Sequence, residues 1–331
     1  MSQAQQSGHA LIRHQEVGTA FEGVYYVESA YVKQTVQKKD YSDLMLRDRS
    51  GGRNVKYWGV VPDLAKGDWV YVSAVVEEYL GNPSLIAKNI EKTDVPDDLS
   101  EYIPVYDDSD DNAGRFDAIR KELEDLEEKN GDSTAGMLVD EVYGNAAFFE
   151  RFVAAPGSAR PHYGRQGGLL ACTVRVAEAC QKMAGAYGLD DKEKMVLLAS
   201  ALLFRVGGID AFEFKDCMPA FTKRGLLLGV GNLTMTRVSS ALKRVVTALM
   251  KDKNGADQEV VIRVLHAVSS HDSRCVVPMT KEAMVLSSAY KADSEMVDAM
   301  DFIANDQNVS EEFTAWDPSM ARKYYTGSRA V

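Results

Sequence analysis

The sequence predicts an α+β protein in which a small antiparallel β-barrel or sandwich precedes an all-helical domain. Residues 19–92 alternate β-branched and aromatic residues with polar ones over short segments, which is the period of strands. Beyond residue 115 the apolar residues recur at helical spacing instead. At 331 residues the chain is also longer than a single hydrophobic core usually supports, which favours two domains.

Five strand-like segments make up residues 19–92, and residues 1–18 before them are expected to be flexible. Turn signals separate the segments, and in chain order they are QKKD, SGG, AKGD and GNP. Short strands at this even spacing are typical of a small barrel or sandwich.

Acidity is concentrated in residues 93–150, which we expect to form an acidic linker followed by helices. This stretch holds 4 basic and 18 acidic residues, whereas the whole chain has a net charge of -11. Its first helical segment places Phe116, Ile119, Leu123 and Leu126 on one stripe with an acidic back. The stripe must be buried, either in its own domain or against another chain, and the acidic back would attract a basic partner.

Residues 151–310 are predicted to form the helical domain, and residues 311–331 a basic and aromatic tail. Periodicity and capping residues predict helices over residues 169–187, 191–205, 234–251, 257–270 and 281–304. The tail contains the sequence RKYY at 322–325, which would either lie along a nucleic acid or pack on the body of the protein.

Cysteine usage and the N-terminal sequence point to a reducing cytoplasm, which would be the host cytoplasm for a viral protein. The four cysteines contain no Cys-x-x-Cys pair, which excludes a zinc ribbon and most redox motifs. Residues 1–30 lack a signal-peptide core, and no run of residues is long enough to span a bilayer.

Residues 26–58 resemble the first three strands of an OB-fold, a barrel that commonly binds single-stranded nucleic acid. Aromatic and basic residues are interleaved on these strands, as a groove that stacks bases and meets phosphates requires. The candidate contacts are Tyr31, Lys33, Lys38, Lys39, Tyr41, Arg47, Arg53, Lys56 and Tyr57, with Arg49 and Trp58 on the same strands. Alternatively, every second ring belongs to the core, at least one of Tyr57 and Trp58 among them, and the lysines form a solvated face.

Residues 152–173, FVAAPGSARPHYGRQGGLLACT, resemble the opening of the HD domain in YhaM-type 3′-to-5′ exoribonucleases. In that family an OB-fold precedes a metal-dependent phosphohydrolase domain of the HD type. Three later stretches match the family pattern in the same order, and they are LLASALLFRVGGIDAFEF, GLLLGV and LHAVSSHDSRCVVPMTKEA. The resemblance therefore implies an OB-like barrel followed by an HD-like domain.

The metal ligands of the HD pattern are largely replaced in this chain. The resemblance places the ligand positions at Cys172, Phe204, Arg205, Val230, Asp272 and Tyr290, while His162, His266 and His271 remain. An HD site needs imidazoles and carboxylates around its metal, so we expect a degenerate site, no catalytic residue, no cofactor and no enzyme activity. A zinc site built from Cys172, His266 and His271 is the alternative, although it needs a fourth ligand.

Basic residues gather near the position of this site, and they are the second set of candidate phosphate contacts. They are Arg160, His162, Arg165, Arg205, Lys223 and Arg224. The planar guanidinium of arginine binds two phosphate oxygens and keeps its charge. Alternatively, Arg205 is paired inside the protein, with Asp210 or Asp272.

These features predict a non-catalytic protein that binds single-stranded nucleic acid, with DNA as the expected ligand and RNA as the alternative. In size, acidity and absence of a catalytic set the chain also resembles, more weakly, the single-stranded-DNA-binding RNA polymerase cofactors of lytic podophages. That resemblance implies a phage transcription cofactor that holds melted promoter DNA and recruits RNA polymerase, for which the acidic segment would be the contact. The alternatives are a metal-dependent 3′-5′ exonuclease with an altered HD site and a protein-interaction module.

Overall fold

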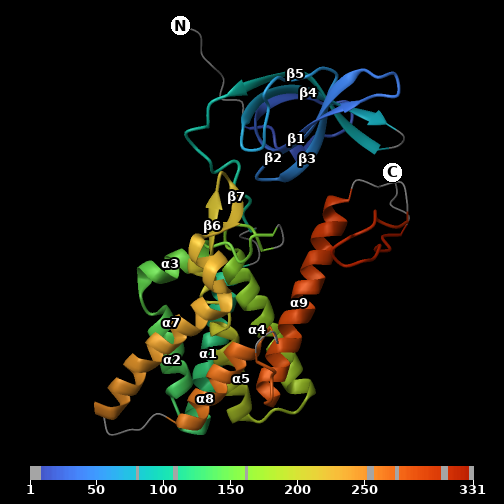
Figure 1. Ribbon diagram of the computed structural model, residues 1–331. Helices are drawn as coiled ribbons and strands as arrows, with labels where there is room; N and C mark the ends of the chain where they lie inside the picture. Colours follow the sequence, from blue (N-terminus) through green and yellow to red (C-terminus); the bar gives the residue numbers. More distant parts are fainter. Residues whose placement is uncertain are drawn as a thin grey trace. The chain divides into compact units, whose positions relative to one another are not determined.

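The computed structural model describes residues 9–79, 82–106, 111–160, 163–251, 257–272, 276–306 and 312–327. The chain divides into two compact units, which are described separately (Figure 1). Met1–Pro104 and Phe302–Val331 make up the first unit, and Val105–Asp301 makes up the second. No helix in the described ranges is long and apolar enough to cross a membrane.

A closed five-stranded barrel forms most of the first unit (Figure 1). Its strands are β1 (Ala20–Gln34), β2 (Asp40–Asp48), β3 (Gly51–Tyr57), β4 (Trp69–Tyr79) and β5 (Asn82–Thr93). They are hydrogen-bonded in the order β1-β2-β3-β5-β4, with β1 and β4 closing the barrel and with β3 and β5 parallel. A five-stranded barrel of this kind is OB-like, which confirms the predicted fold class for this part of the chain.

The barrel interior is filled by side chains that alternate inward along the strands. Tyr25 and Val27 on β1, Leu44 and Leu46 on β2, and Val55 on β3 are all almost completely buried in one cluster. Their spacing explains the period of two in the sequence, because successive residues of a strand point to opposite faces.

Of residues 1–18, which the sequence predicts to be flexible, residues 1–8 lie outside the described residues, and residues 9–18 pack against the barrel. A short 3-10 helix, η1 (Ile12–His14), places Ile12 fully inside the barrel core. The Ile12 amide donates to the buried carboxylate of Asp48 over 2.6 Å, and the Tyr25 hydroxyl donates to the Ala10 carbonyl over 2.6 Å. The segment is therefore part of the folded first unit.

Helices dominate the second unit. They are α1 (Asn112–Asn130), α2 (Thr134–Tyr143), α3 (Ala146–Ala154), α4 (Gly168–Ala186), α5 (Asp191–Leu203), α6 (Gly208–Ala211), α7 (Lys223–Lys251), α8 (Gln258–Ser270) and α9 (Lys281–Asn305), the last of which runs on into the first unit. Between α6 and α7 the chain also forms an antiparallel hairpin, β6 (Phe212–Lys215) and β7 (Met218–Phe221), which the sequence does not predict. The helical domain is thus confirmed with one small sheet added.

Helix α1 buries its apolar stripe inside its own domain. Phe116, Ile119, Leu123 and Leu126 are at most 4% exposed and belong to one core cluster with residues of α4 and α5. Of the two predicted partners for the stripe, its own domain and another chain, the structure shows its own domain. The acidic back stays outside, where Glu122, Glu124 and Glu128 are exposed.

Candidate nucleic-acid interface

The outer face of the barrel collects most of the rings and cations that the sequence singles out. The strand register sets Tyr31 of β1 opposite Asp43 of β2, and Asp43 opposite Lys56 of β3. It also sets Lys33 opposite Tyr41. Because directly opposed residues point to the same side of a sheet, these side chains share one face. Tyr31 is 62% exposed and presents its ring to solvent.

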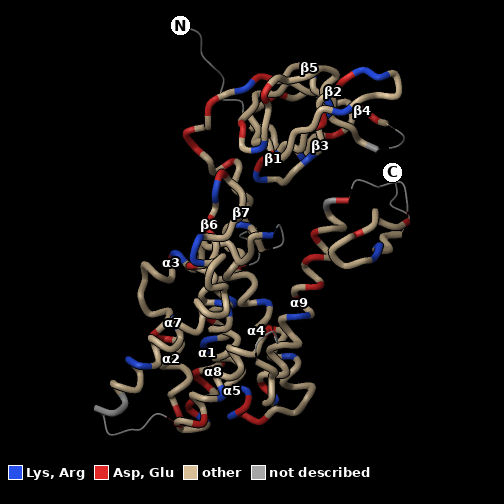
Figure 2. The backbone as a smooth tube through the Cα atoms, in the orientation of Figure 1, with Lys and Arg blue, Asp and Glu red and all other residues tan. Residues whose placement is uncertain are grey.

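Three of the predicted cations are already engaged by acceptors of the first unit. Lys33 is ion-paired with Asp43, whose pKa is lowered because hydrogen bonds from Lys33 and Asn54 outweigh the opposing effect of burial. Arg47 and Arg53 are held by acceptors of the same unit: the Arg47 Nε lies 2.9 Å from a Glu28 oxygen, and the Arg53 Nη1 donates to the carbonyls of Ile12 and Gln15. Basic and acidic residues are interspersed on the barrel strands (Figure 2). The positive groups of Lys33, Arg47 and Arg53 therefore already have partners within the first unit.

Two ring arrangements on the barrel are open to solvent. The Tyr41 and Trp58 rings lie 5.3 Å apart between centroids, and Trp58 is 61% exposed. The Lys56 Nζ lies 5.6 Å from the ring centroid of Tyr79, which is 64% exposed. Sequence reasoning missed Tyr79, although the pairing of β4 with β5 and of β5 with β3 brings it next to the predicted strands.

The remaining barrel candidates divide between the core and the turn. Tyr57 is partly buried and packs against the barrel core, as the alternation of a strand requires. Lys38 and Lys39 lie in the turn between β1 and β2 and are both exposed. Arg49 pairs with Glu101 at 3.2 Å.

In the second unit, a cluster of rings stands at the position of the predicted HD site. Phe204 follows α5 and is fully buried, with its centroid 5.2 Å from that of His271 and 5.4 Å from that of Tyr290. The His271 and Tyr290 centroids are 5.3 Å apart. Phe204 and Tyr290 are two of the positions at which the family resemblance predicts metal ligands, and in the structure their rings pack against each other.

Arg205 is held against this cluster. Its Nη1 donates to the Tyr290 hydroxyl over 2.7 Å, and its Nη2 donates to the Gly157 carbonyl over 2.8 Å. Its Nε is buried with no hydrogen-bond partner. Burial alone would lower the pKa of Arg205, but the neighbouring Tyr290, Cys172 and Tyr163 outweigh it, so the guanidinium stays charged. Asp210, one of its predicted partners, accepts from Arg237 instead.

A buried polar group lies beside this cluster. The Tyr163 hydroxyl lies 2.5 Å from one oxygen of Asp293, and the Arg175 Nε lies 3.0 Å from the other. Burial raises the pKa of the Cys172 thiol to about 12, so this cysteine stays protonated near neutral pH.

The other basic candidates of the second unit are spread over several segments. The Arg165 guanidinium lies 5.9 Å from the Tyr106 ring centroid and 3.5 Å from Asp301. Arg160, Lys223 and Arg224 are exposed. His162 lies outside the described residues.

The described residues do not fit a divalent metal of the HD type. Within the described ranges, no group of three or more His, Cys, Asp or Glu side chains is placed to hold an ion. A protonated Cys172 and a charged Arg205 stand at ligand positions, and both disfavour a cation. The His266 Nε2 accepts from the Met279 amide over 2.9 Å, which occupies one of the nitrogens a zinc site would need.

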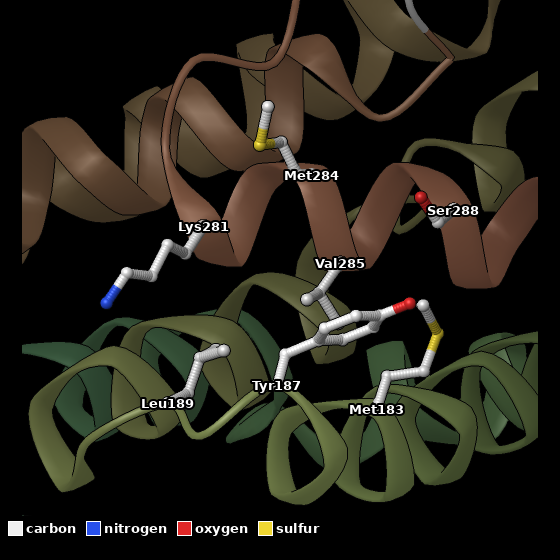
Figure 3. Close-up of a pocket in the computed structure, with 7 residues that line it drawn as sticks. All are labelled: Met183, Tyr187, Leu189, Lys281, Met284, Val285 and Ser288. Carbon is white, nitrogen blue, oxygen red and sulfur yellow. The ribbon is translucent and has the colours of Figure 1, made fainter.

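A separate hollow of about 340 Å³ lies between the end of α4 and the start of α9 (Figure 3). Its lining is Met183, Tyr187, Leu189, Lys281, Met284, Val285 and Ser288. The Tyr187 ring and the Val285 side chain point toward each other, and the one cation, Lys281, pairs with Glu193 at 2.8 Å. This apolar lining does not suit a phosphodiester.

Comparison with known proteins links both units to one kind of enzyme. No family model matches the chain. It is 23% identical over 296 residues to the 3′-5′ exoribonuclease YhaM of Bacillus velezensis, covering 85% of this chain and 87% of that protein. Similar matches are found to YhaM of Bacillus subtilis, 23% over 295 residues (85% and 87%), and of Shouchella clausii, 21% over 300 residues (86% of each). The chain thus has an OB-like barrel followed by an HD-type helical domain.

Solved structures similar to part of the chain are also found. One of them is the second OB-fold domain of replication protein A from Methanococcus maripaludis, with 18% identity and a TM-score of 0.23. The match covers 28% of this chain and all of that domain.

These relatives contradict the prediction of a non-catalytic DNA-binding protein that is not an enzyme. They carry the name of a 3′-5′ exoribonuclease, and the match runs through the helical domain as well as the barrel. We inferred the loss of activity from departures at the expected HD metal ligands. Such departures argue only against catalysis by that set of ligands, not against every kind of nuclease activity. The role as a phage transcription cofactor depended on the same inference, and it is withdrawn with it.

Proposed function

We propose that this protein is a 3′-5′ exonuclease that acts on single-stranded RNA. The observation that carries the proposal is the collinear match across barrel and helical domain to relatives named 3′-5′ exoribonuclease, over 85% of this chain and 87% of the relative. A match of this length includes both the unit that would hold a strand and the unit that would cleave it.

The barrel supplies the grip on the strand in this proposal. Tyr31, Trp58 and Tyr79 expose rings on which bases can stack. The bases of a single strand are free to do so, whereas in a duplex the neighbouring base pairs already cover the base faces. Lys38 and Lys39 on the neighbouring turn supply charge for the phosphates. The contribution of Lys33 and Arg47 is smaller, because their charges are already paired.

The helical unit supplies the site for the 3′ end. Arg205 holds a charged guanidinium with an unpartnered buried Nε, and Arg160, Lys223 and Arg224 are exposed on other segments of the same unit. Arginine positions and neutralises phosphate without a metal. Since the described residues do not fit the metal centre of the HD pattern, no step of the proposal runs through one.

The surroundings of the cysteines suit a reducing compartment, and we place the protein in the cytoplasm. Cys172, Cys180 and Cys217 are free and buried.

The acidic back of α1 offers a site for a basic protein partner, since Glu122, Glu124 and Glu128 remain exposed there.

The test is degradation of single-stranded RNA labelled at its 5′ end, in parallel with DNA of the same sequence. We expect a ladder of fragments that shorten from the 3′ end, and slower or no shortening of a blunt RNA duplex. Runs with magnesium, with manganese and with EDTA show whether an added ion matters. Arg205→Leu, purified in the same way, should lose the ladder. RNA that stays intact in every condition contradicts the proposal, and an unchanged ladder with Arg205→Leu would remove Arg205 from the site for the 3′ end.

A further inference from the structure

The C-terminal residues 312–327 form a braced loop in the first unit. Two isolated bridges cross it, pairing Phe313 with Tyr325 and Asp317 with Arg322. The backbone adds a hydrogen bond from the Thr314 amide to the Tyr324 carbonyl over 2.9 Å. A loop with its own cross-links holds its outward side chains in fixed positions.

Asp317 is the centre of this brace. It is 2% exposed, and its carboxylate accepts hydrogen bonds from the Ser319 amide at 2.8 Å and from the Tyr324 hydroxyl at 3.0 Å. Burial alone would raise the pKa of Asp317, but these hydrogen bonds outweigh it and lower the pKa. Tyr324 also packs against Phe302, with centroids 5.9 Å apart. One of the two predicted tail tyrosines is therefore structural.

The outer side of the loop is aromatic and basic. Phe313 is 46% exposed, Trp316 57% and Tyr325 66%, and the rings of Phe313 and Tyr325 lie 5.3 Å apart. Arg322 and Lys323 are exposed on the same loop. A single exposed ring is common on a protein surface, whereas several exposed rings gathered on one segment mark a site of interaction.

We propose that this loop is a second stacking platform for single-stranded nucleic acid, separate from the face of the barrel. The inference builds on the proposed function, because it needs a protein that takes up a single strand. Exposed rings beside cations match the needs of a strand, whose bases stack and whose phosphates are negative. A neutral apolar peptide would make no use of Arg322 and Lys323, so the charge of the loop favours the strand.

Tryptophan fluorescence can measure binding at the barrel face and at the C-terminal loop separately. The chain has three tryptophans, of which Trp69 is 4% exposed while Trp58 lies on the barrel and Trp316 on the loop. In the Trp58→Phe variant, a 30-nucleotide phosphorothioate oligouridylate should quench the emission of Trp316, because stacking on a base quenches indole. In Trp316→Phe, the same oligonucleotide reports on the barrel.

The outcomes separate this inference from the proposed function. Quenching in both variants supports a second platform. Quenching of Trp58 alone overturns the second platform and leaves strand binding by the barrel in place. No quenching and no mobility shift with either variant overturns both, whereas a normal RNA ladder without loop quenching overturns only the platform.

Affinity measurements give a second, independent reading. Trp316→Ala and Tyr325→Ala should each weaken binding about 5- to 150-fold, the equivalent of one lost base stack. Lys323→Ala should lower the slope of log affinity against log salt by about one ion. The matched control is Tyr187→Ala, which removes a ring that is 70% exposed on the helical unit. Circular dichroism checks folding, and loop variants that bind as tightly as the control overturn the platform.

Discussion

Glu127 of helix α1 provides a quantitative test of how burial controls a carboxylate in this fold. Burial raises its pKa to about 7; the hydrogen bond from the Gly136 amide at 2.5 Å opposes the rise, and nearby Asp132 and Asp140 add to it. Glu127→Gln removes the charge while keeping an oxygen that can accept from Gly136. The variant therefore isolates the free-energy cost of holding an ionised carboxylate at position 127.

The sign of the effect follows from the direction of the pKa shift. Because the folded-state pKa of Glu127 lies above the usual 4.5, the folded protein binds the proton more tightly than the unfolded chain. The stability that this gives is complete below pH 4.5 and is lost as pH rises through 7. The whole shift corresponds to about 3 kcal/mol. Since the side chain is only half-buried, solvent screening reduces it to about 1 to 2 kcal/mol.

Glu127→Gln should therefore raise the free energy of unfolding by about 1 to 2 kcal/mol at pH 8 and by almost nothing at pH 4.5. Urea denaturation of the two proteins at both pH values measures this difference. The control is Glu124→Gln, which removes an exposed charge from the same helix. An equal gain for Glu127→Gln at the two pH values would refute the assignment of the shift to burial.

Three further predictions follow from the site. Tyr79→Ala should weaken binding of single-stranded oligonucleotides by about 1 to 3 kcal/mol, measured by fluorescence anisotropy, and equal binding would remove this ring from the interface. Lys38→Ala should flatten the salt dependence of binding more than Lys33→Ala, because Lys33 is already paired with Asp43; the reverse order would show that the strand breaks that ion pair. Reversing the charges of the exposed α1 residues Glu122, Glu124 and Glu128 should reduce capture of a basic protein partner. The affinity for oligonucleotides should stay unchanged or rise. Capture that persists would show that the acidic side of α1 does not bind the partner.

The barrel was predictable because its core repeats a local pattern. Leu44 and Leu46 point inward two residues apart, and a period of two is visible in any short window of the sequence. The β6 and β7 hairpin was not predictable in this way. Its strands are four residues each, and the tight turn places Asp216 and Cys217 at positive φ, which sequence patterns do not favour.

The candidate site was predictable only in part, because its contacts depend on register and on distant segments. Lys33 meets Asp43 through the pairing of β1 with β2, ten residues further along the chain, and a list of cations cannot show that its charge is taken. Arg205 meets the Tyr290 hydroxyl from a helix 85 residues away. The sequence departs from the HD pattern at Phe204 and Arg205, but the conclusion that activity is lost did not follow from that departure.

The most direct test of the proposed exonuclease uses two partial RNA duplexes that differ only in which strand end is single-stranded. A 3′ overhang should be shortened nucleotide by nucleotide up to the duplex, and a 5′ overhang of the same sequence should remain intact. Mass spectrometry of the products, with Arg205→Leu as the matched inactive protein, measures both. Shortening of the 5′ overhang, or full-length RNA from both substrates, would contradict the account.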